Sequence, residues 1–251
     1  LKIAVSVVQF LPWAPHLNAM KNFFTFLIII LLISCEREPS NFFPSSVGLK
    51  WLYSIKISSS YTGKEYEKRL MVTNIDAKKK NNKLDLSKLN SDGSFYTYQI
   101  NFDNNQVIRS SAVLAFDEGM VEPIKKIIYP DIFFKKNEWI IKEQLFLIKG
   151  FQPPLRNVKP RKKFDMKYKI IKRLNNFRFN GEEYKNCIEI KGVGNTSFIG
   201  DTRSGPINVD IINNELVCDG VGIIKQKRIE KTNASAFGNM TFEKKLLTFK
   251  K

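Results

Sequence analysis

Few side chains in this chain are of the types that commonly catalyse reactions. The single histidine, His16, precedes Met20, which we interpret as the start of translation. The chain after Met20 therefore lacks the Ser-His-Asp and Cys-His arrangements of nucleophilic catalysis and the imidazole ligands of common zinc sites. Cys187 and Cys218 are too few for a thiolate metal site. We expect neither a bound metal nor a cofactor.

Acidic side chains are the remaining candidates for catalysis. Two neighbouring pairs, Asp117-Glu118 and Glu182-Glu183, could supply a general acid and a general base, as in glycoside hydrolysis. Each pair lies at a turn that contains glycine, where solvated acids are common, and Asp201 and Asp210 are no better placed. We therefore predict a non-catalytic protein and keep a carboxylate-dependent envelope hydrolase as an alternative.

Cys35 is the most informative residue for location. It follows a short basic segment, 20–22, an apolar run, 23–33, and Ser34. The apolar run is too short to span a bilayer, which takes about 20 apolar residues. The ending Leu32-Ile33-Ser34-Cys35 resembles the lipobox of bacterial lipoproteins, and the resemblance implies that Cys35 is lipidated and becomes the mature N-terminus.

These features predict how the chain is organised. Residues 1–19 are an upstream extension that is not translated, 20–34 a lipoprotein signal peptide, 35–46 the lipidated cysteine with a tether, and 47–251 a β-rich envelope domain. We expect the acyl chains to hold the protein at a membrane of the bacterial cell envelope. Glu36 after the cysteine favours the outer membrane, facing the periplasm, over the inner one.

The charge of the chain is strongly positive. Lys and Arg number 41 against 24 Asp and Glu, which gives a formal net charge of +17. Most of these cations are lysines in short, scattered clusters, whereas arginine suits bidentate recognition of phosphate better. We therefore predict no nucleic-acid partner and only a salt-sensitive attraction to anionic membranes.

The body of the chain alternates in the period of β-strands. Residues 51–57 and 95–102 alternate apolar and polar positions, and Asn180-Gly181 separates two β-prone runs as in a hairpin. Helical periodicity is weak, with 121–128 and 159–174 as the best candidates and the second also compatible with a strand. We predict a mainly β fold: an antiparallel sheet, sandwich or open barrel built of hairpins, with little helix.

A disulfide between Cys187 and Cys218 is possible in an oxidising envelope. Strand alternation puts Cys187 on the same face as Lys185 and Glu189, and Cys218 on the same face as Leu216. The pairing stays open, because it needs both side chains on one face unless a bulge intervenes.

Several segments together resemble a group of uncharacterised bacterial lipoproteins. These are Phe43-Pro44 followed by 47–53 (Val-Gly-Leu-Lys-Trp-Leu-Tyr), Tyr129-Pro130 followed by Trp139, the 179–190 strand with its Asn-Cys, and the 216–225 strand with its Gly-Val-Gly-Ile-Ile-Lys. The resemblance implies a β-rich envelope domain and no catalytic residues.

The resulting functional prediction is a lipid-anchored, non-catalytic envelope protein that binds a hydrophobic ligand or an envelope partner protein. The alternative besides the hydrolase is a purely structural or assembly lipoprotein. Large aromatic side chains are the candidates for either core packing or the lining of a ligand site. They are Trp51, Tyr96, Tyr98, Phe102 and Trp139.

Overall fold

The computed structural model describes residues 41–113, 126–148, 150, 153, 155–156, 160, 162–200 and 205–251, all within the compact unit Ser40–Lys251. Within these residues the chain forms twelve β-strands and no helix, so none of them makes a helix long and apolar enough to cross a membrane. The strands are β1 (Lys50–Ser59), β2 (Glu65–Lys80), β3 (Lys83–Asn90), β4 (Phe95–Asn101), β5 (Gln106–Val113), β6 (Lys126–Tyr129), β7 (Glu138–Gln144), β8 (Lys163–Phe179), β9 (Glu182–Ile199), β10 (Pro206–Cys218), β11 (Gly222–Thr232) and β12 (Asn239–Lys250).

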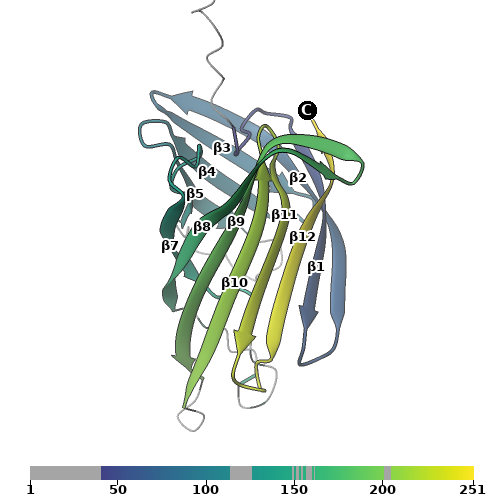
Figure 1. Ribbon diagram of the computed structural model, residues 1–251, viewed down its shortest axis with the longest axis vertical. Coiled ribbons are helices and arrows are strands. Elements are labelled where there is room, and N and C mark those ends of the chain that lie inside the picture. Colours follow the sequence, from purple (N-terminus) through teal and green to yellow (C-terminus); the bar gives the residue numbers. More distant parts are fainter. Residues whose placement is uncertain are drawn as a thin grey trace, which may run out of the picture. The chain divides into compact units, whose positions relative to one another are not determined.

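The strands form one antiparallel sheet in the order β6-β5-β4-β3-β2-β1-β12-β11-β10-β9-β8-β7. Each half, β1–β6 and β7–β12, is a meander of neighbouring strands, and the pairing of β1 with β12 joins the halves. The sheet curls until its two edges, β6 and β7, come close together (Figure 1). The result is a nearly closed, barrel-like sheet, which confirms the predicted antiparallel β fold.

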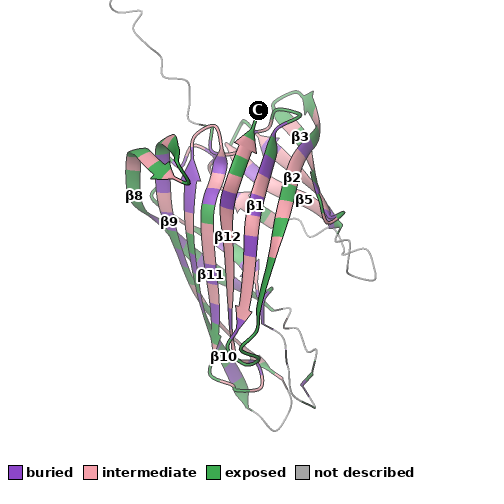
Figure 2. Cartoon of the chain, turned by 90° about the vertical axis from the view of Figure 1, so that its right-hand side faces the viewer, coloured by how far each residue is buried: buried purple, intermediate pink, exposed green. Residues whose placement is uncertain are grey.

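Alternation along most of the strands divides interior from exterior. In β10, Ile207, Val209 and Ile211 are buried while the residues between them are exposed, and this striping recurs across the sheet (Figure 2). Such a period of two is what a strand with one buried face requires. Where the alternation is regular, the interior therefore receives every second side chain of a strand.

The candidate helix 159–174 is instead part of a strand. From Lys163 onward the segment belongs to β8, and Phe164, Met166, Tyr168 and Ile170 are all buried with exposed residues between them. In a helix these positions would lie on different sides, so the alternating burial shows that the segment is a strand. Of the candidate helix 121–128, residues 126–128 lie in β6 and the others outside the described residues.

Cys187 and Cys218 form a disulfide between directly opposite positions of β9 and β10. Cys187 is only 1% exposed because the alternation of β9 shifts at Asn186, whose φ is +48°. That left-handed residue turns two successive side chains, Cys187 and Ile188, toward the interior. The pairing that simple alternation argues against is thus made by a local irregularity.

Two apolar clusters fill much of the interior. One surrounds the disulfide and includes Trp51, Tyr53 and Leu246, and the other holds most of the buried apolar residues of β8–β10 together with Phe134 and Phe237. Phe42 and Pro44, which sequence analysis places in the tether, are buried against the fold. Asn41 is hydrogen-bonded to the turn between β10 and β11, through Asp219 and Gly220.

Candidate ligand chamber

A cavity of about 540 Å³ lies inside the sheet, between strands β1–β5 and β11–β12; we call it the chamber. Apolar side chains form most of its wall, and four cations, one carboxylate and two amides interrupt them. The lining residues are Phe42, Phe43, Pro44, Trp51, Tyr53, Ile55, Ile57, Lys68, Leu70, Val72, Lys88, Asn90, Asp92, Tyr96, Tyr98, Arg109, Ile128, Tyr129, Phe146, Leu147, Val221, Gly222, Ile223, Gln226, Phe242 and Lys244.

Lys88 lies in a cage of aromatic rings. Its Nζ is 4.3 Å from the ring centre of Phe43, 4.7 Å from that of Trp51 and 5.6 Å from that of Tyr98. It follows Leu86 by two positions on β3, so alternation turns both side chains inward. Burial, aided by the charge of Lys244, lowers the pKa of Lys88 to about 7. The rings stabilise the ammonium group through cation–π attraction but do not neutralise its charge.

Two further cations reach the chamber from other strands. Lys244 of β12 lies with its Nζ 4.0 Å from the ring centre of Tyr53, and burial lowers the pKa of Lys244 to about 8. Arg109 of β5 packs its guanidinium 6.0 Å from the ring centre of Tyr96, and its buried Nε has no hydrogen-bond partner among the described residues. The chamber thus brings together positive groups from β3, β5 and β12.

Only the fourth cation of the chamber is paired. Lys68 forms an ion pair of 2.9 Å with Asp92. Among the described residues, Lys88, Lys244 and Arg109 have no carboxylate within ion-pair distance. Asp92 is the one carboxylate among the described lining residues, which therefore carry an excess of positive charge.

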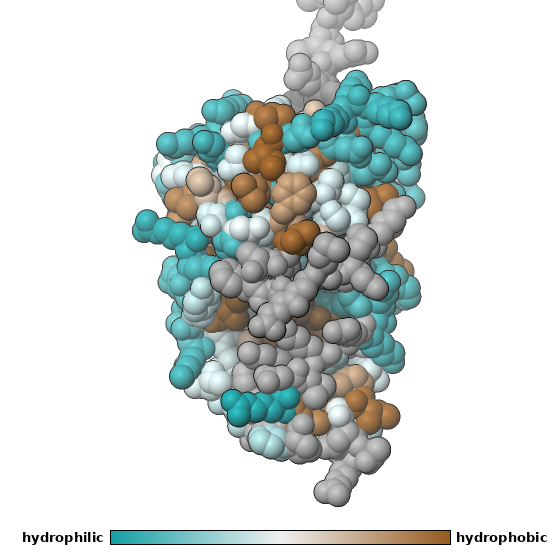
Figure 3. Space-filling view, turned by 180° about the vertical axis from the view of Figure 1, so that it is seen from behind, coloured by the Kyte–Doolittle hydropathy of each residue, from teal (hydrophilic) through white to brown (hydrophobic). Residues whose placement is uncertain are grey.

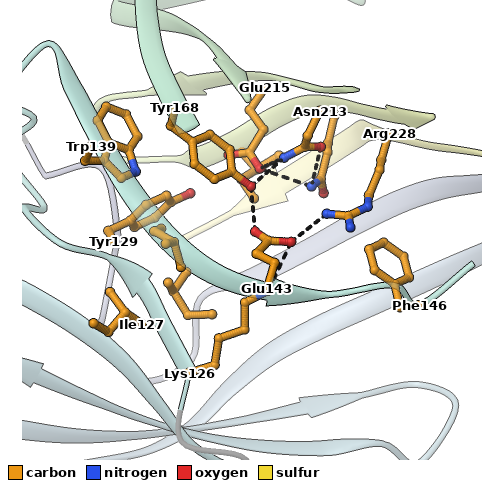
Figure 4. Close-up of a pocket in the computed structure, with 14 residues that line it drawn as sticks. Lys126, Ile127, Tyr129, Trp139, Glu143, Phe146, Tyr168, Asn213, Glu215 and Arg228 are labelled. Atoms are coloured by element: carbon orange, nitrogen blue, oxygen red, sulfur yellow. Dashed lines mark hydrogen bonds and ion pairs between the residues drawn. The ribbon is translucent and has the colours of Figure 1, made fainter. Parts of the chain in front are cut away.

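A second, smaller cavity of about 150 Å³ adjoins the chamber and shares Ile128, Tyr129, Phe146, Ile223 and Gln226 with it. Its polar side chains form a continuous network (Figure 4). Arg228 donates to Glu143 at 2.6 Å and to Glu230 at 2.9 Å, and both pairs are almost completely buried. Tyr168 donates to the other oxygen of Glu143 at 2.6 Å.

Glu230 joins this network to the backbone beyond β7. Its carboxylate accepts the N–H groups of Phe146, Leu147 and Ile148 at 3.0–3.3 Å in addition to the Arg228 contact. These donors satisfy a carboxylate that is fully inaccessible to water. The network therefore fixes the segment after β7 against β11.

The pKa values of two network carboxylates move in opposite directions. Burial would raise the pKa of Glu143, but the charges of Lys126, 3.6 Å away, and Arg228 hold it below its usual value. Burial raises the pKa of Glu215, whose Oε1 accepts from Asn213 at 2.7 Å and from Gln226 at 3.1 Å. One carboxylate is thus held ionised while the other is biased toward its protonated form.

Gly192 of β9 makes room for the aromatic part of the network. A Cβ atom built there would lie 2.4 Å from Tyr168, so any other residue would displace the ring that contacts Glu143. Trp139 stacks on Tyr168 with ring centres 5.7 Å apart, and its buried Nε1 finds no hydrogen-bond partner in the described part of the chain. The positions of Tyr168 and Trp139 therefore depend on the missing side chain at Gly192.

The aromatic residues singled out in the sequence divide among three places. Trp51, Tyr96 and Tyr98 line the chamber, and Trp51 is also a core residue, 3% exposed, whose Nε1 donates to Val221 at 2.8 Å. Trp139 lines the smaller cavity. Phe102 is neither core nor lining, because it lies just beyond β4 in a turn and is 41% exposed.

Those acidic residues singled out in the sequence that the structure describes line neither cavity. Glu182 and Glu183 lie exposed where β9 begins, and Asp210 is exposed on β10. Asp117, Glu118, Asp201 and the lipidation candidate Cys35 lie outside the described residues. No group of three or more potential metal ligands occurs in the described part of the chain.

The charged residues that do meet were missed in the sequence. They are Lys88, Arg109, Lys244, Glu143, Glu215, Arg228 and Glu230. One feature of the sequence could have identified some of them: a charged residue at an inward position of an alternating strand. Examples are Leu86-x-Lys88-x-Asn90 and Ile224-x-Gln226-x-Arg228-x-Glu230.

Comparison with known proteins gives similarity in shape alone. No family model matches the chain, and no curated protein matches it. Two solved structures are similar: a putative lipoprotein from Parabacteroides distasonis, 13% identical with a TM-score of 0.40, and a putative exported protein with a YmcC-like fold from Bacteroides fragilis, 11% identical with a TM-score of 0.38. They cover 85% and 84% of this chain, and each is itself covered completely.

Proposed function

We propose that this protein is a lipid-anchored, non-catalytic envelope protein that holds a hydrophobic ligand in the chamber. The observation that supports this most is the chamber itself, about 540 Å³ with a mainly aromatic and aliphatic wall. That volume falls within the roughly 300–1,000 Å³ of small-molecule sites, which are also mostly apolar with a few polar groups.

The physical reason for binding is the hydrophobic effect. Transferring apolar surface of a ligand from water to this wall contributes roughly 25 cal/mol for each Å² that is buried. An acyl anchor at Cys35 would keep the chamber beside a membrane, where hydrophobic ligands are concentrated. Anchor and chamber together support a role in holding or carrying such a molecule.

A purely structural role explains the chamber less well. Protein interiors are close-packed, and voids larger than a water molecule are few. A scaffold without a ligand would gain stability if larger side chains filled this space. An apolar cavity of this size, with aromatic rings arranged around unpaired cations, fits a binding role better.

The structure offers the hydrolase alternative better candidates than the exposed pair Glu182-Glu183. Glu143 and Glu215 line one cavity, and their pKa values are shifted in opposite directions, as in acid–base pairs. However, both oxygens of Glu143 are occupied by Tyr168 and Arg228, and the cavity of about 150 Å³ is small for a substrate. A hydrolase activity that Glu215→Gln abolishes would establish this alternative.

The test of the proposal is native mass spectrometry of the full chain purified from its own host. Leu70 lines the chamber, so Leu70→Trp should fill it. Met71, the next residue of β2, is 43% exposed, so Met71→Trp is a matched control that leaves the chamber open. We expect a small hydrophobic molecule on the parent and on Met71→Trp, and its loss from Leu70→Trp. A parent protein that carries no such molecule and takes up no added amphiphile would contradict the proposal.

A further inference from the structure

We propose that the ligand carries an anionic group, a phosphate or a carboxylate, which is bound by Lys88, Lys244 and Arg109. This inference rests on the proposed function and specifies the class of ligand. The three cations come from β3, β12 and β5, far apart in the sequence, and all line the one chamber. The geometry points to an anion among them, with the apolar part of the ligand against the aromatic wall.

The first argument is the energetic cost of these cations. Removing a charge from water without a partner is unfavourable, so buried charges in proteins are normally paired. Lys88 and Lys244 have aromatic rings around them, and the buried Nε of Arg109 has no acceptor. An anionic group of a ligand would supply the missing acceptor to all three.

The second argument is how the same interior treats its other cations. Arg228 is paired with Glu143 and Glu230, Lys126 lies 3.6 Å from Glu143, and Lys68 is paired with Asp92. These three interior cations thus have carboxylate partners. Among the described residues, Lys88, Lys244 and Arg109 have none, and they line the space where a ligand would lie.

The third argument is the arrangement of rings around the charges. Phe43, Trp51 and Tyr98 surround Lys88, and Tyr53 lies against Lys244. The rings contact the ammonium groups without offering an oxygen acceptor, and no described carboxylate pairs with either group, so an anionic ligand could accept charge-assisted hydrogen bonds from both. Charge-assisted hydrogen bonds of this kind are about twice as strong as neutral ones.

The experiment compares amphiphiles that share one chain and differ in the head group. The full chain is held in nanodiscs of zwitterionic lipid, and tryptophan fluorescence, to which Trp51 of the chamber contributes, reports binding. Dodecyl phosphate, dodecanoate and dodecanol are titrated, and empty nanodiscs correct for partition into lipid. A fourth titration, with inorganic phosphate alone, tests whether a free anion binds as well as an anionic amphiphile.

We expect dodecyl phosphate and dodecanoate to bind at least about tenfold more tightly than dodecanol. Lys88→Met and Lys244→Met should each reduce this preference while dodecanol still binds. Lys245→Met is the matched control, because Lys245 follows Lys244 on β12 but pairs with Glu243 and has a side chain that is 44% exposed.

The other outcomes separate this inference from the proposed function. If dodecanol binds as tightly as dodecyl phosphate, the anionic group is refuted and the hydrophobic chamber stands. If inorganic phosphate alone binds as tightly as dodecyl phosphate, the anion site stands and the hydrophobic ligand is refuted. If none of the four compounds binds, the proposed function fails and this inference fails with it.

Discussion

The chamber and the adjoining network treat buried charge in opposite ways. In the network, Arg228 has two carboxylate partners and Glu230 has four donors, so each charge is compensated within the chain. In the chamber, Lys88, Lys244 and Arg109 have aromatic neighbours but no described carboxylate partner. This difference supports a division of roles: the paired charges stabilise the fold, and the unpaired cations could bind an anionic ligand.

The largest effect should come from breaking the compensated region. Arg228→Met removes the cation shared by Glu143 and Glu230 and leaves Glu143 only the more distant Lys126, so we expect it to lower the free energy of unfolding by about 3–5 kcal/mol. Urea unfolding followed by circular dichroism measures the change. Lys227→Met is the control, because Lys227 is 42% exposed on the same strand and its ion pair with Glu243 should contribute less than about 1 kcal/mol. Equal effects of the two substitutions would refute the distinction.

A smaller effect of opposite sign should come from the chamber. Lys88→Met removes an uncompensated cation and keeps an unbranched side chain, so we expect it to raise the free energy of unfolding at neutral pH by about 1 kcal/mol. The pKa of Lys88 in the folded protein is about 7, below the value of about 10.4 for an unfolded chain. The parent therefore gains stability as pH rises from 7 toward 10, because the folded state releases this proton first.

The advantage of Lys88→Met should accordingly be larger at pH 6 than at pH 9. Urea unfolding at the two pH values measures it. If Lys88→Met destabilises the protein at both pH values, the ammonium group stabilises the fold, and the contrast between chamber and network is refuted.

The fold was predictable from the sequence because its signals are local. Alternation marks the strands, and Asn180-Gly181 forms the hairpin between β8 and β9 with φ values of +51° and +84°. Such a pair of left-handed residues is what a two-residue β-hairpin turn of type I′ requires. The Cys187–Cys218 disulfide could be named as a possibility but not predicted. The left-handed backbone of Asn186, which brings the two cysteines together, cannot be recognised from the sequence.

The site was much less predictable because its contacts join distant residues. Glu143 and Arg228 are 85 positions apart, and sequence alone does not show that β7 and β11 face each other across the interior. Register shifts within the pairings of β1 with β12, β2 with β3 and β8 with β9 further change which residues point inward. In the sequence, Lys88 therefore cannot be distinguished from the exposed lysines of this basic chain. Its contacts with Phe43, Trp51 and Tyr98 distinguish it in the structure.

The most direct test of the central claim is the pKa of Lys88 with and without an anionic amphiphile. Lysine labelled with ¹³C at Cε gives an NMR signal for each ammonium group, and the signal that is absent from Lys88→Met identifies Lys88. The pH titration is followed on the full chain, free and saturated with dodecyl phosphate. We predict a pKa of about 7 in the free protein and a higher value in the complex, because an adjacent anion favours the charged form. Affinity for dodecyl phosphate should correspondingly fall as pH rises above 7. Saturation with dodecyl phosphate that leaves the pKa of Lys88 unchanged would contradict the account.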